Sequence, residues 1–218
     1  MGTYQAGDET KELILRTCKK LFYEKGYKET TARDISKATH TNISAISYHF
    51  GGKDGIRQII IDQILDAVTL RASNISNDFG MRYIIGGYIL WYMIYNDEKF
   101  RRFYCGFVID QESSYFENPL KDFLVYLYTV FDVNYTKPDA LARKYDLQIA
   151  TALLSEKVCC EYVLKDLNRY TYYEMAEMNT RLEGTLLGIP EEVMKKKFRE
   201  ARKLLKTMDM SIYPTDLN

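Results

Sequence analysis

The chain has 218 residues, of which 46% are hydrophobic, and 30 basic side chains balance 30 acidic ones. This length suits one large or two small domains with a substantial core. The start of the chain is polar and partly acidic, and the longest uncharged apolar run, residues 83–95, is shorter than the about 20 residues that span a bilayer. We therefore expect no signal peptide, no transmembrane segment and no membrane partner.

Residues 1–9 are predicted to form a loose arm, and residues 10–25 the first helix. Apolar or small side chains recur along this helix at spacings of three and four, which gives it one apolar stripe; they are Leu13, Ile14, Thr17, Cys18, Leu21 and Phe22. Gly26 ends the helix. We expect it to form a hydrophobic floor under the next two helices.

Two short helices joined by a tight turn are predicted next. Thr31 and Asp34 make a capping box that starts a helix directly after the threonine, and residues 39–41 carry no helix-extending pattern. Asn42 is a favourable N-cap for a second helix over residues 43–50, which two glycines end. This spacing predicts a helix-turn-helix, whose second helix can enter the major groove of DNA.

The remaining chain is predicted to be helical, so the expected fold class is all-α. A fourth helix covers residues 53–73, and the polar residues 74–79 mark a domain boundary. The predicted division is a helix-turn-helix domain at 1–52, a linking helix and boundary at 53–78, and a larger helical domain at 79–218. Further helices are predicted over 80–97, 99–110, 119–134, 139–168, 172–187 and 190–207.

Four short motifs follow one another within residues 10–60: FYEKGY at 22–27, TTARDI at 30–35, ISYHF at 46–50 and KD at 53–54. In order and spacing they resemble the N-terminal signature of the tetracycline-repressor (TetR) family of bacterial transcriptional regulators. The resemblance implies a cytoplasmic repressor that binds DNA as a dimer and is released by a small effector held in the C-terminal domain.

The resemblance also implies a DNA contact at each matching position. Thr31 and Arg33 look like phosphate or groove-edge contacts, Tyr48 and His49 like backbone contacts, and Lys53 like a phosphate clamp. The residues that resemble the base-reading part of the recognition helix are Asn42, Ile43, Ser44, Ala45 and Ser47. Phosphate contacts would set the position of the protein, and base contacts would set the sequence preference.

The chain departs from the family pattern at three positions of this motif. The family usually carries glycine where His40 stands, threonine at Ala45 and tyrosine at Ser47. Ile43 and Ala45 offer methyl contacts in place of bidentate hydrogen bonds, so no operator sequence is predicted. Residues 1–53 hold 9 basic and 6 acidic side chains, against 21 and 24 in the remainder, which predicts salt-sensitive DNA binding.

A homodimer is predicted from the helix expected over residues 139–168. Between Leu147 and Leu164 its apolar residues fall on almost all sides, so one face can pack on its own core and another on a partner subunit. The helix over 172–187 is expected to complete the interface. Two-fold symmetry would place the recognition helices about one DNA turn apart, roughly 34 Å, on a near-palindromic operator.

Aromatic side chains in the larger domain suggest an effector pocket, because such pockets are mostly apolar with few polar groups. Glu156 offers a charge for a cationic ligand, assisted by cation–π attraction. The aromatic candidates are Tyr88, Trp91, Tyr92, Tyr95, Phe103, Phe107 and Tyr126. The same pattern also suits plain core packing. In the mechanism that the resemblance implies, an unidentified effector shifts the fourth helix and alters the separation of the two DNA-binding heads.

Other functions are less well supported by the residues present. The two histidines, His40 and His49, both lie in the DNA motif, and no catalytic or phosphate-binding motif occurs, so we expect no enzyme, cofactor or metal. Three alternatives stay open: a redox- or metal-responsive regulator that uses Cys159 and Cys160, a helical enzyme with a carboxylate site, and a DNA-binding dimer without effector. The cysteine pattern lacks a C-x-x-C pair and fits a reducing cytoplasm.

Overall fold

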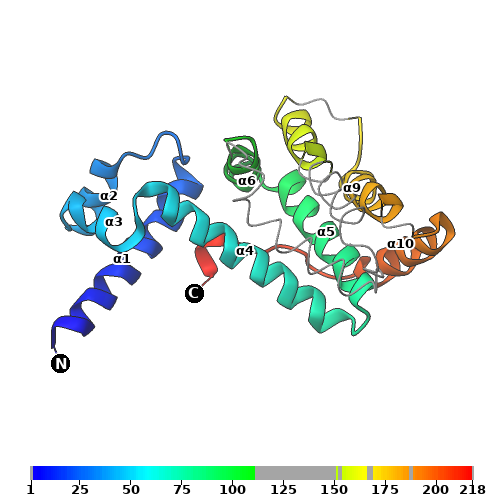
Figure 1. The fold of residues 1–218 in the computed structure, drawn as a ribbon, viewed down its shortest axis with the longest axis horizontal. Coiled ribbons are helices and arrows are strands. Elements are labelled where there is room, and N and C mark those ends of the chain that lie inside the picture. Colours follow the sequence, from blue (N-terminus) through cyan, green and yellow to red (C-terminus); the bar gives the residue numbers. More distant parts are fainter. Residues whose placement is uncertain (1, 111–150, 152–153, 166–168, 187–188, 218) are drawn as a thin grey trace, which may run out of the picture.

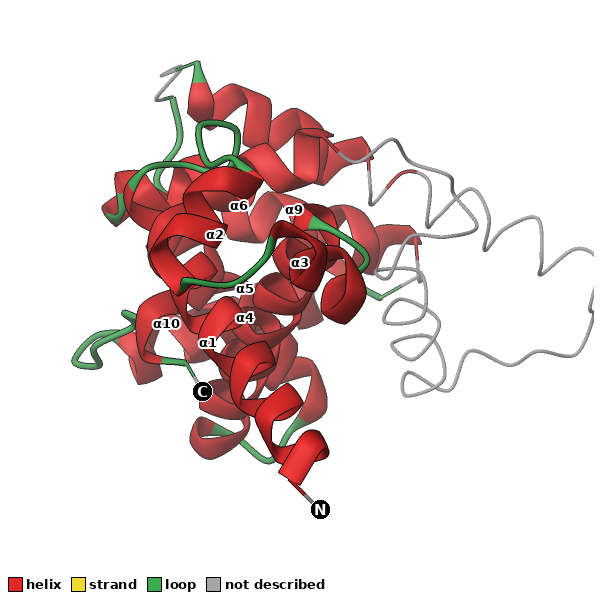
Figure 2. Cartoon of the chain, turned by 90° about the vertical axis from the view of Figure 1, so that its left-hand side faces the viewer, coloured by secondary structure: helices red, strands yellow, loops and turns green. Residues whose placement is uncertain are grey.

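The computed structural model describes residues 2–110, 151, 154–165, 169–186 and 189–217. These residues form helices and short loops, with no strand among them (Figure 2), which confirms the predicted all-α class. Residues 154–164 are helical. The other helices are α1 (Gly2–Glu24), α2 (Ala32–Thr39), α3 (Ile43–Phe50), α4 (Lys53–Ile75), α5 (Phe79–Asn96), α6 (Glu98–Asp110), α9 (Tyr172–Leu186) and α10 (Glu191–Leu205), followed by a 3-10 turn, η1 (Pro214–Asp216).

The helices fall into two groups that α4 joins (Figure 1). Helices α1, α2 and α3 pack together at one end, and we call them the head. Helices α5, α6, α9 and α10 lie at the other end with residues 154–164, and we call them the body; α5 contacts α4, α6, α9 and α10. In the described part of the chain, no helix is long and apolar enough to span a membrane.

The head has its own apolar core, built where the sequence pattern predicted it. Three residues of the predicted stripe of α1 are buried and the other three are half-buried, and α2 and α3 each turn one face onto the stripe. The core residues are Ile14, Cys18, Phe22, Ile35, Ile46 and Phe50. Because α3 is held only by its inner face, its outer face is free for other contacts.

Local capping sets the ends of α2 and α3, as predicted. The Thr31 hydroxyl accepts a hydrogen bond from the Asp34 amide at 3.1 Å, and the Asp34 carboxylate accepts one from the Thr31 amide at 2.8 Å. The Asn42 side chain accepts a hydrogen bond from the Ser44 amide at 3.1 Å. Gly51 ends α3 with a φ of 69°, which glycine adopts without strain.

The first helix differs from its prediction. Residues 1–9 were expected to form an arm, but α1 begins at Gly2. Once the packed part of the helix is formed, each added residue gains a hydrogen bond without a new nucleation step, and no proline interrupts the segment. The expectation of a loose arm is therefore wrong from Gly2 onward.

The later boundaries agree closely with the predictions where they can be compared. Helix α4 extends two residues past its predicted end at residue 73, and α5, α6 and α9 match within one residue at each end. The predicted helix over 119–134 lies outside the described residues. Of the one over 139–168, residue 151 and residues 154–165 are described; residues 151 and 154–164 are helical, and residue 165 is in a turn.

A buried polar network holds three helices of the body together. The Tyr88 hydroxyl of α5 donates to Glu177 of α9 at 2.6 Å, and Arg202 Nε of α10 donates to the same carboxylate oxygen at 2.7 Å. Arg181 pairs with the second oxygen of Glu177 at 3.3 Å. Because Tyr88 and Glu177 are buried, these hydrogen bonds satisfy groups that would otherwise destabilise the fold.

Replacing His40 with valine is expected to lower the free energy of unfolding by about 1–2 kcal/mol, because His40 has a left-handed φ of 55° and a branched Cβ clashes in that conformation. His40→Gly should keep the stability of the wild type. Thermal unfolding followed by circular dichroism measures both. Lys37→Val, at an exposed helical position of α2, is the control; an equal loss in both valine variants would contradict the prediction.

Candidate nucleic-acid interface

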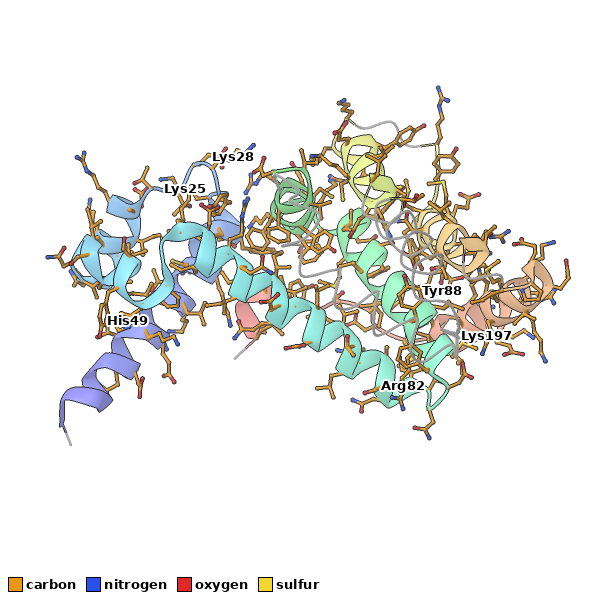
Figure 3. The ribbon with its side chains drawn as sticks, viewed as in Figure 1. Lys25, Lys28, His49, Arg82, Tyr88 and Lys197 are labelled. Carbon is orange, nitrogen blue, oxygen red and sulfur yellow. The ribbon has the colours of Figure 1, made fainter. Side chains whose placement is uncertain are left out.

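Helix α3 presents most of the predicted DNA-contacting residues on its outer face. The side chain of Tyr48 is 84% exposed and that of Ile43 is 43% exposed, while Asn42, Ser44 and Ser47 are exposed as well. In Figure 3, His49 lies in the head, far from Tyr88 and Lys197 in the body. The structure thus gathers polar, aromatic and methyl groups on one surface remote from the body.

The N-terminal end of α3 is polar and accessible. Asn42 uses its side-chain oxygen for the cap, which leaves its amide NH₂ group to donate outward. The partial positive charge at a helix N-terminus also favours a nearby phosphate. This end of α3 therefore combines hydrogen-bond donors with a favourable field for DNA.

Helix α2 and its N-cap carry two predicted phosphate contacts, Arg33 and Thr31, which differ in their surroundings. Arg33 is exposed, and no ion pair or hydrogen bond of its side chain occurs within the described residues. The Thr31 hydroxyl, in contrast, donates to the Asp34 carboxylate at 2.8 Å while it caps the helix. Hydrogen bonds from Lys25, and then from Thr31, hold the pKa of Asp34 well below its usual range. Arg33 is thus better placed than Thr31 to hold a phosphate.

Tyr48 and His49 pack against each other at the C-terminal end of α3. Their rings meet edge to face with centroids 4.9 Å apart, and the half-buried His49 ring lies 6.2 Å from that of Phe50. The core residue Phe50 therefore supports His49, which in turn supports the exposed Tyr48 ring. The predicted backbone contacts of Tyr48 and His49 remain predictions.

Lys53, which is predicted to hold a phosphate, already makes contacts within the protein. Its ammonium donates to the carbonyls of Tyr27 and Thr30 at 2.8 and 2.9 Å, and it lies 4.0 Å from the centroid of the Tyr27 ring. Burial lowers the pKa of Lys53. Two of its three N–H groups thus hold the loop between α1 and α2, and the phosphate contact stays a prediction. The loop acceptors lie more than 20 residues away in sequence, so helical spacing could not reveal them.

A cluster of charges and rings joins the head to α4 and α6, and we call it the head–body junction. The Arg57 guanidinium stacks over the Tyr27 ring at 3.8 Å and pairs with Asp110 at 3.2 Å. Lys28 pairs with the other Asp110 oxygen at 2.9 Å, and the Tyr27 hydroxyl donates to Asp54. Lys28 also lies on the edge of the head that faces α6 (Figure 3). The junction therefore connects the DNA-binding elements to the last turn of α6.

The predicted effector residues occupy two packing environments. Tyr88, Trp91, Tyr92 and Tyr95 belong to α5, where Tyr88 and Tyr92 meet tyrosines of α9 edge to face. Phe103 and Phe107 lie on α6 toward the head; Phe103 stacks on Phe22 and Phe107 lies under Arg57. Tyr126 lies outside the described residues. Most of these rings therefore serve as core in the part of the chain that the structure describes.

Glu156, the predicted polar group of the effector site, is paired with a tyrosine of α6. Its carboxyl accepts a hydrogen bond from the Tyr104 hydroxyl of α6 at 2.8 Å. Burial raises the pKa of Glu156 and that of Tyr104. The sequence pointed to Glu156 as an acid within a largely apolar helix, but not to Tyr104, 52 residues away. A surface hollow occurs elsewhere, lined by Ser76, Asp78, Met81, Lys197, Glu200, Lys203 and Leu204.

The cysteines are poorly placed for redox or metal chemistry. Cys18, Cys105, Cys159 and Cys160 are all buried with free thiols. Burial raises the pKa of Cys159 to about 11, and a hydrogen bond with Cys105, followed by burial, raises that of Cys160. The thiolate is the reactive and metal-binding form, so these surroundings disfavour the redox- or metal-responsive alternative. Among the described residues there is no group of three or more potential metal ligands.

Comparison with known proteins adds to this geometry. Residues 14–58 match the family described as "Bacterial regulatory proteins, tetR family". The chain is also 34% identical over 71 residues to the "Probable HTH-type transcriptional regulator YttP" of Bacillus subtilis (strain 168). That match covers 31% of this chain and 34% of the relative, so the chain spans about a third of the relative's length. The matched family segment contains α2, α3 and the start of α4.

Proposed function

We propose that this chain, which belongs to the TetR family of bacterial regulatory proteins, represses transcription in the cytoplasm by binding double-stranded DNA as a homodimer. The observation that carries the proposal is the exposed face of α3, with its accessible N-terminal end, on a head whose opposite side is packed. In this proposal α3 enters the major groove, and Arg33 of α2 holds a phosphate beside it.

Exposed apolar residues in the body support the homodimer. Leu154 and Val158, one helical turn apart, are 63% and 54% exposed, and Met178 of α9 is exposed as well. Such side chains on neighbouring helices favour burial against a second copy, and a two-fold axis would present two α3 helices to a near-palindromic site. Multi-angle light scattering on Leu154→Glu tests this interface; an unchanged dimer would exclude Leu154 from it.

Release by a small effector is the second part of the proposal. The support is the partly buried Tyr104–Glu156 pair, which connects α6 to residues 154–164, and the junction at the last turn of α6. A ligand bound near this pair, with preference for one position of α6, would shift the separation of the heads. In this proposal residues 1–52 bind DNA, residues 53–78 form the linking helix and boundary, and residues 79–218 hold the effector and the dimer interface.

The proposed function is tested first by selection of DNA ligands. Purified protein is incubated with random duplexes at several salt concentrations, and the bound fraction is sequenced. Enrichment of an inverted repeat bound by two protomers supports the proposal. Weak binding without sequence preference at physiological salt would contradict it, because nonspecific phosphate contacts alone produce that behaviour.

Arg33→Ala is expected to weaken binding to the selected operator and to reduce the slope of log K against log salt by about 2, because each of the two protomers loses one phosphate contact. The loss should be similar for all sequences. Fluorescence anisotropy over a salt series measures both quantities. The control is Arg169→Ala, which removes an exposed arginine of the body; equal effects of the two variants would contradict the assignment.

A further inference from the structure

A segment of the chain returns from the body to the head after the last long helix. Helix α10 ends at Leu205, and residues 206–217 then run to η1, which contacts α1 (Figure 1). We call residues 206–217 the C-terminal strap. The strap thus provides a connection between body and head that does not pass through α4.

The first half of the strap is fixed to α4. Arg71 of α4 donates to the backbone carbonyl of Asp209 at 3.0 Å, and the Asp209 carboxylate accepts from the Ser211 amide at 2.9 Å. The Met210 side chain between them is buried. These contacts set the direction in which the strap leaves the body.

The second half is fixed to α1. Pro214 is buried, and Leu217 packs against the core. Lys19 of α1, which is 4% exposed, donates to the Leu217 carbonyl. Burial lowers the pKa of Lys19, and a buried ammonium is strongly destabilising without an acceptor. The Leu217 carbonyl therefore supplies a partner that Lys19 needs in the folded head.

We infer that the C-terminal strap restrains the orientation of α1 relative to α10, and so acts as a further link, beside α4 and the head–body junction, through which the body controls the head. Helix α4 and the junction with α6 already connect the two parts, and the strap adds a separate connection that starts from α10 and reaches α1. Helix α10 packs on α5 and α9, so a rearrangement there would move the origin of the strap. The consequence for DNA rests on the proposed function; the restraint on α1 does not.

Hydrogen exchange tests the restraint directly. Pro214→Asp places a charge at a buried position of the strap, whereas Thr215→Asp adds the same charge at its exposed neighbour. Local opening raises exchange rates in the affected unit alone. We expect the amides of residues 14–22 to exchange on the order of tenfold faster in Pro214→Asp, with those of α5 unchanged, and no change in Thr215→Asp.

A deletion tests the same restraint without the Pro214→Asp substitution. Removal of residues 211–218 should raise exchange in α1 as Pro214→Asp does. Unchanged exchange in α1 for both variants would overturn the inference. An equal rise in α1 and α5 would also overturn it, because that result indicates general destabilisation of the fold.

DNA binding then tests the functional consequence. On selected operators whose half-site spacing is changed by one base pair, the wild type should discriminate by on the order of tenfold more than Pro214→Asp, because a head with a loosened α1 adapts more easily to either spacing. An unchanged spacing preference in a variant with loosened α1 would overturn the control of orientation. If the wild type selects no operator, the proposed function fails, and the exchange experiment still decides the restraint on α1.

Discussion

Replacing Asp110 with alanine is expected to lower the free energy of unfolding by about 2–3 kcal/mol, because it leaves a buried guanidinium without its main counter-ion. The Arg57 side chain is 9% exposed and pairs with Asp110 at 3.2 Å. Its other carboxylate partner, Asp54, lies at 3.4 Å and is largely exposed, so it compensates only in part. Urea unfolding followed by circular dichroism measures the loss.

The matched control for this substitution is Asp66→Ala, which removes an exposed aspartate of α4. Similar losses in the two variants would show that the ion pair contributes nothing. Because the junction joins α6 to the head, Asp110→Ala should also weaken binding to the selected operator, while the direct DNA contacts of Arg33 and α3 remain.

Acid should reduce the difference between the wild type and Asp110→Ala. Burial alone would raise the pKa of Asp110, but hydrogen bonds from Lys28 and Arg57 outweigh it and lower the pKa. A carboxyl with a lowered folded pKa stabilises the protein above its unfolded pKa, about 4, and loses that contribution as pH falls through the folded value. The two unfolding free energies should therefore converge below about pH 4.

Glu183→Gln is expected to stabilise the protein by about 3 kcal/mol at pH 9, and to remove part of its sensitivity to base. Burial raises the pKa of Glu183 to about 8, so the folded state keeps a proton that the unfolded chain loses near pH 4.5. Stability is therefore present in acid and lost as pH rises through the folded pKa. The Tyr83 hydroxyl donates to this carboxyl, which favours the ionised form and limits the effect.

The measurement for Glu183→Gln is thermal or urea unfolding at pH 5, 7 and 9. The two proteins should have similar stability at pH 5 and diverge at higher pH. Glu12→Gln, at an exposed position of α1, is the control and should follow the wild type. A constant difference between Glu183→Gln and the wild type at all three pH values would contradict the assignment of the titrating group.

The helix-turn-helix could be predicted almost residue by residue because its signals are local. The Thr31–Asp34 box, the Asn42 cap and Gly51 each act within a few residues of their own position. The same holds for the spacing of three and four residues along α1 that predicted its apolar stripe, of which Ile14, Cys18 and Phe22 lie in the core. Short-range hydrogen bonds and one helical period determine these features, so the amino-acid sequence shows them directly.

The features that were missed depend on contacts between distant segments. Lys53 binds carbonyls of the α1–α2 loop, and Tyr104 binds Glu156 across 52 residues. The strap returns from α10 to α1, where it brings together Lys19 and Leu217, which are 198 residues apart in the sequence. No helical period encodes such pairings, because they depend on how the helices pack. The aromatic candidates of the body were ambiguous for the same reason, since core and pocket share one composition.

The burial of the four thiols makes the protein well suited to site-specific labelling. An accessible thiolate attacks a maleimide or a thiol-reactive nitroxide reagent, and Cys18, Cys105, Cys159 and Cys160 offer no accessible thiolate in the folded state. A single cysteine introduced at an exposed site of the head, such as Lys20→Cys, would then be the one reactive position per chain. The distance between two such labels would report the separation of the heads in a dimer, without a cysteine-free background.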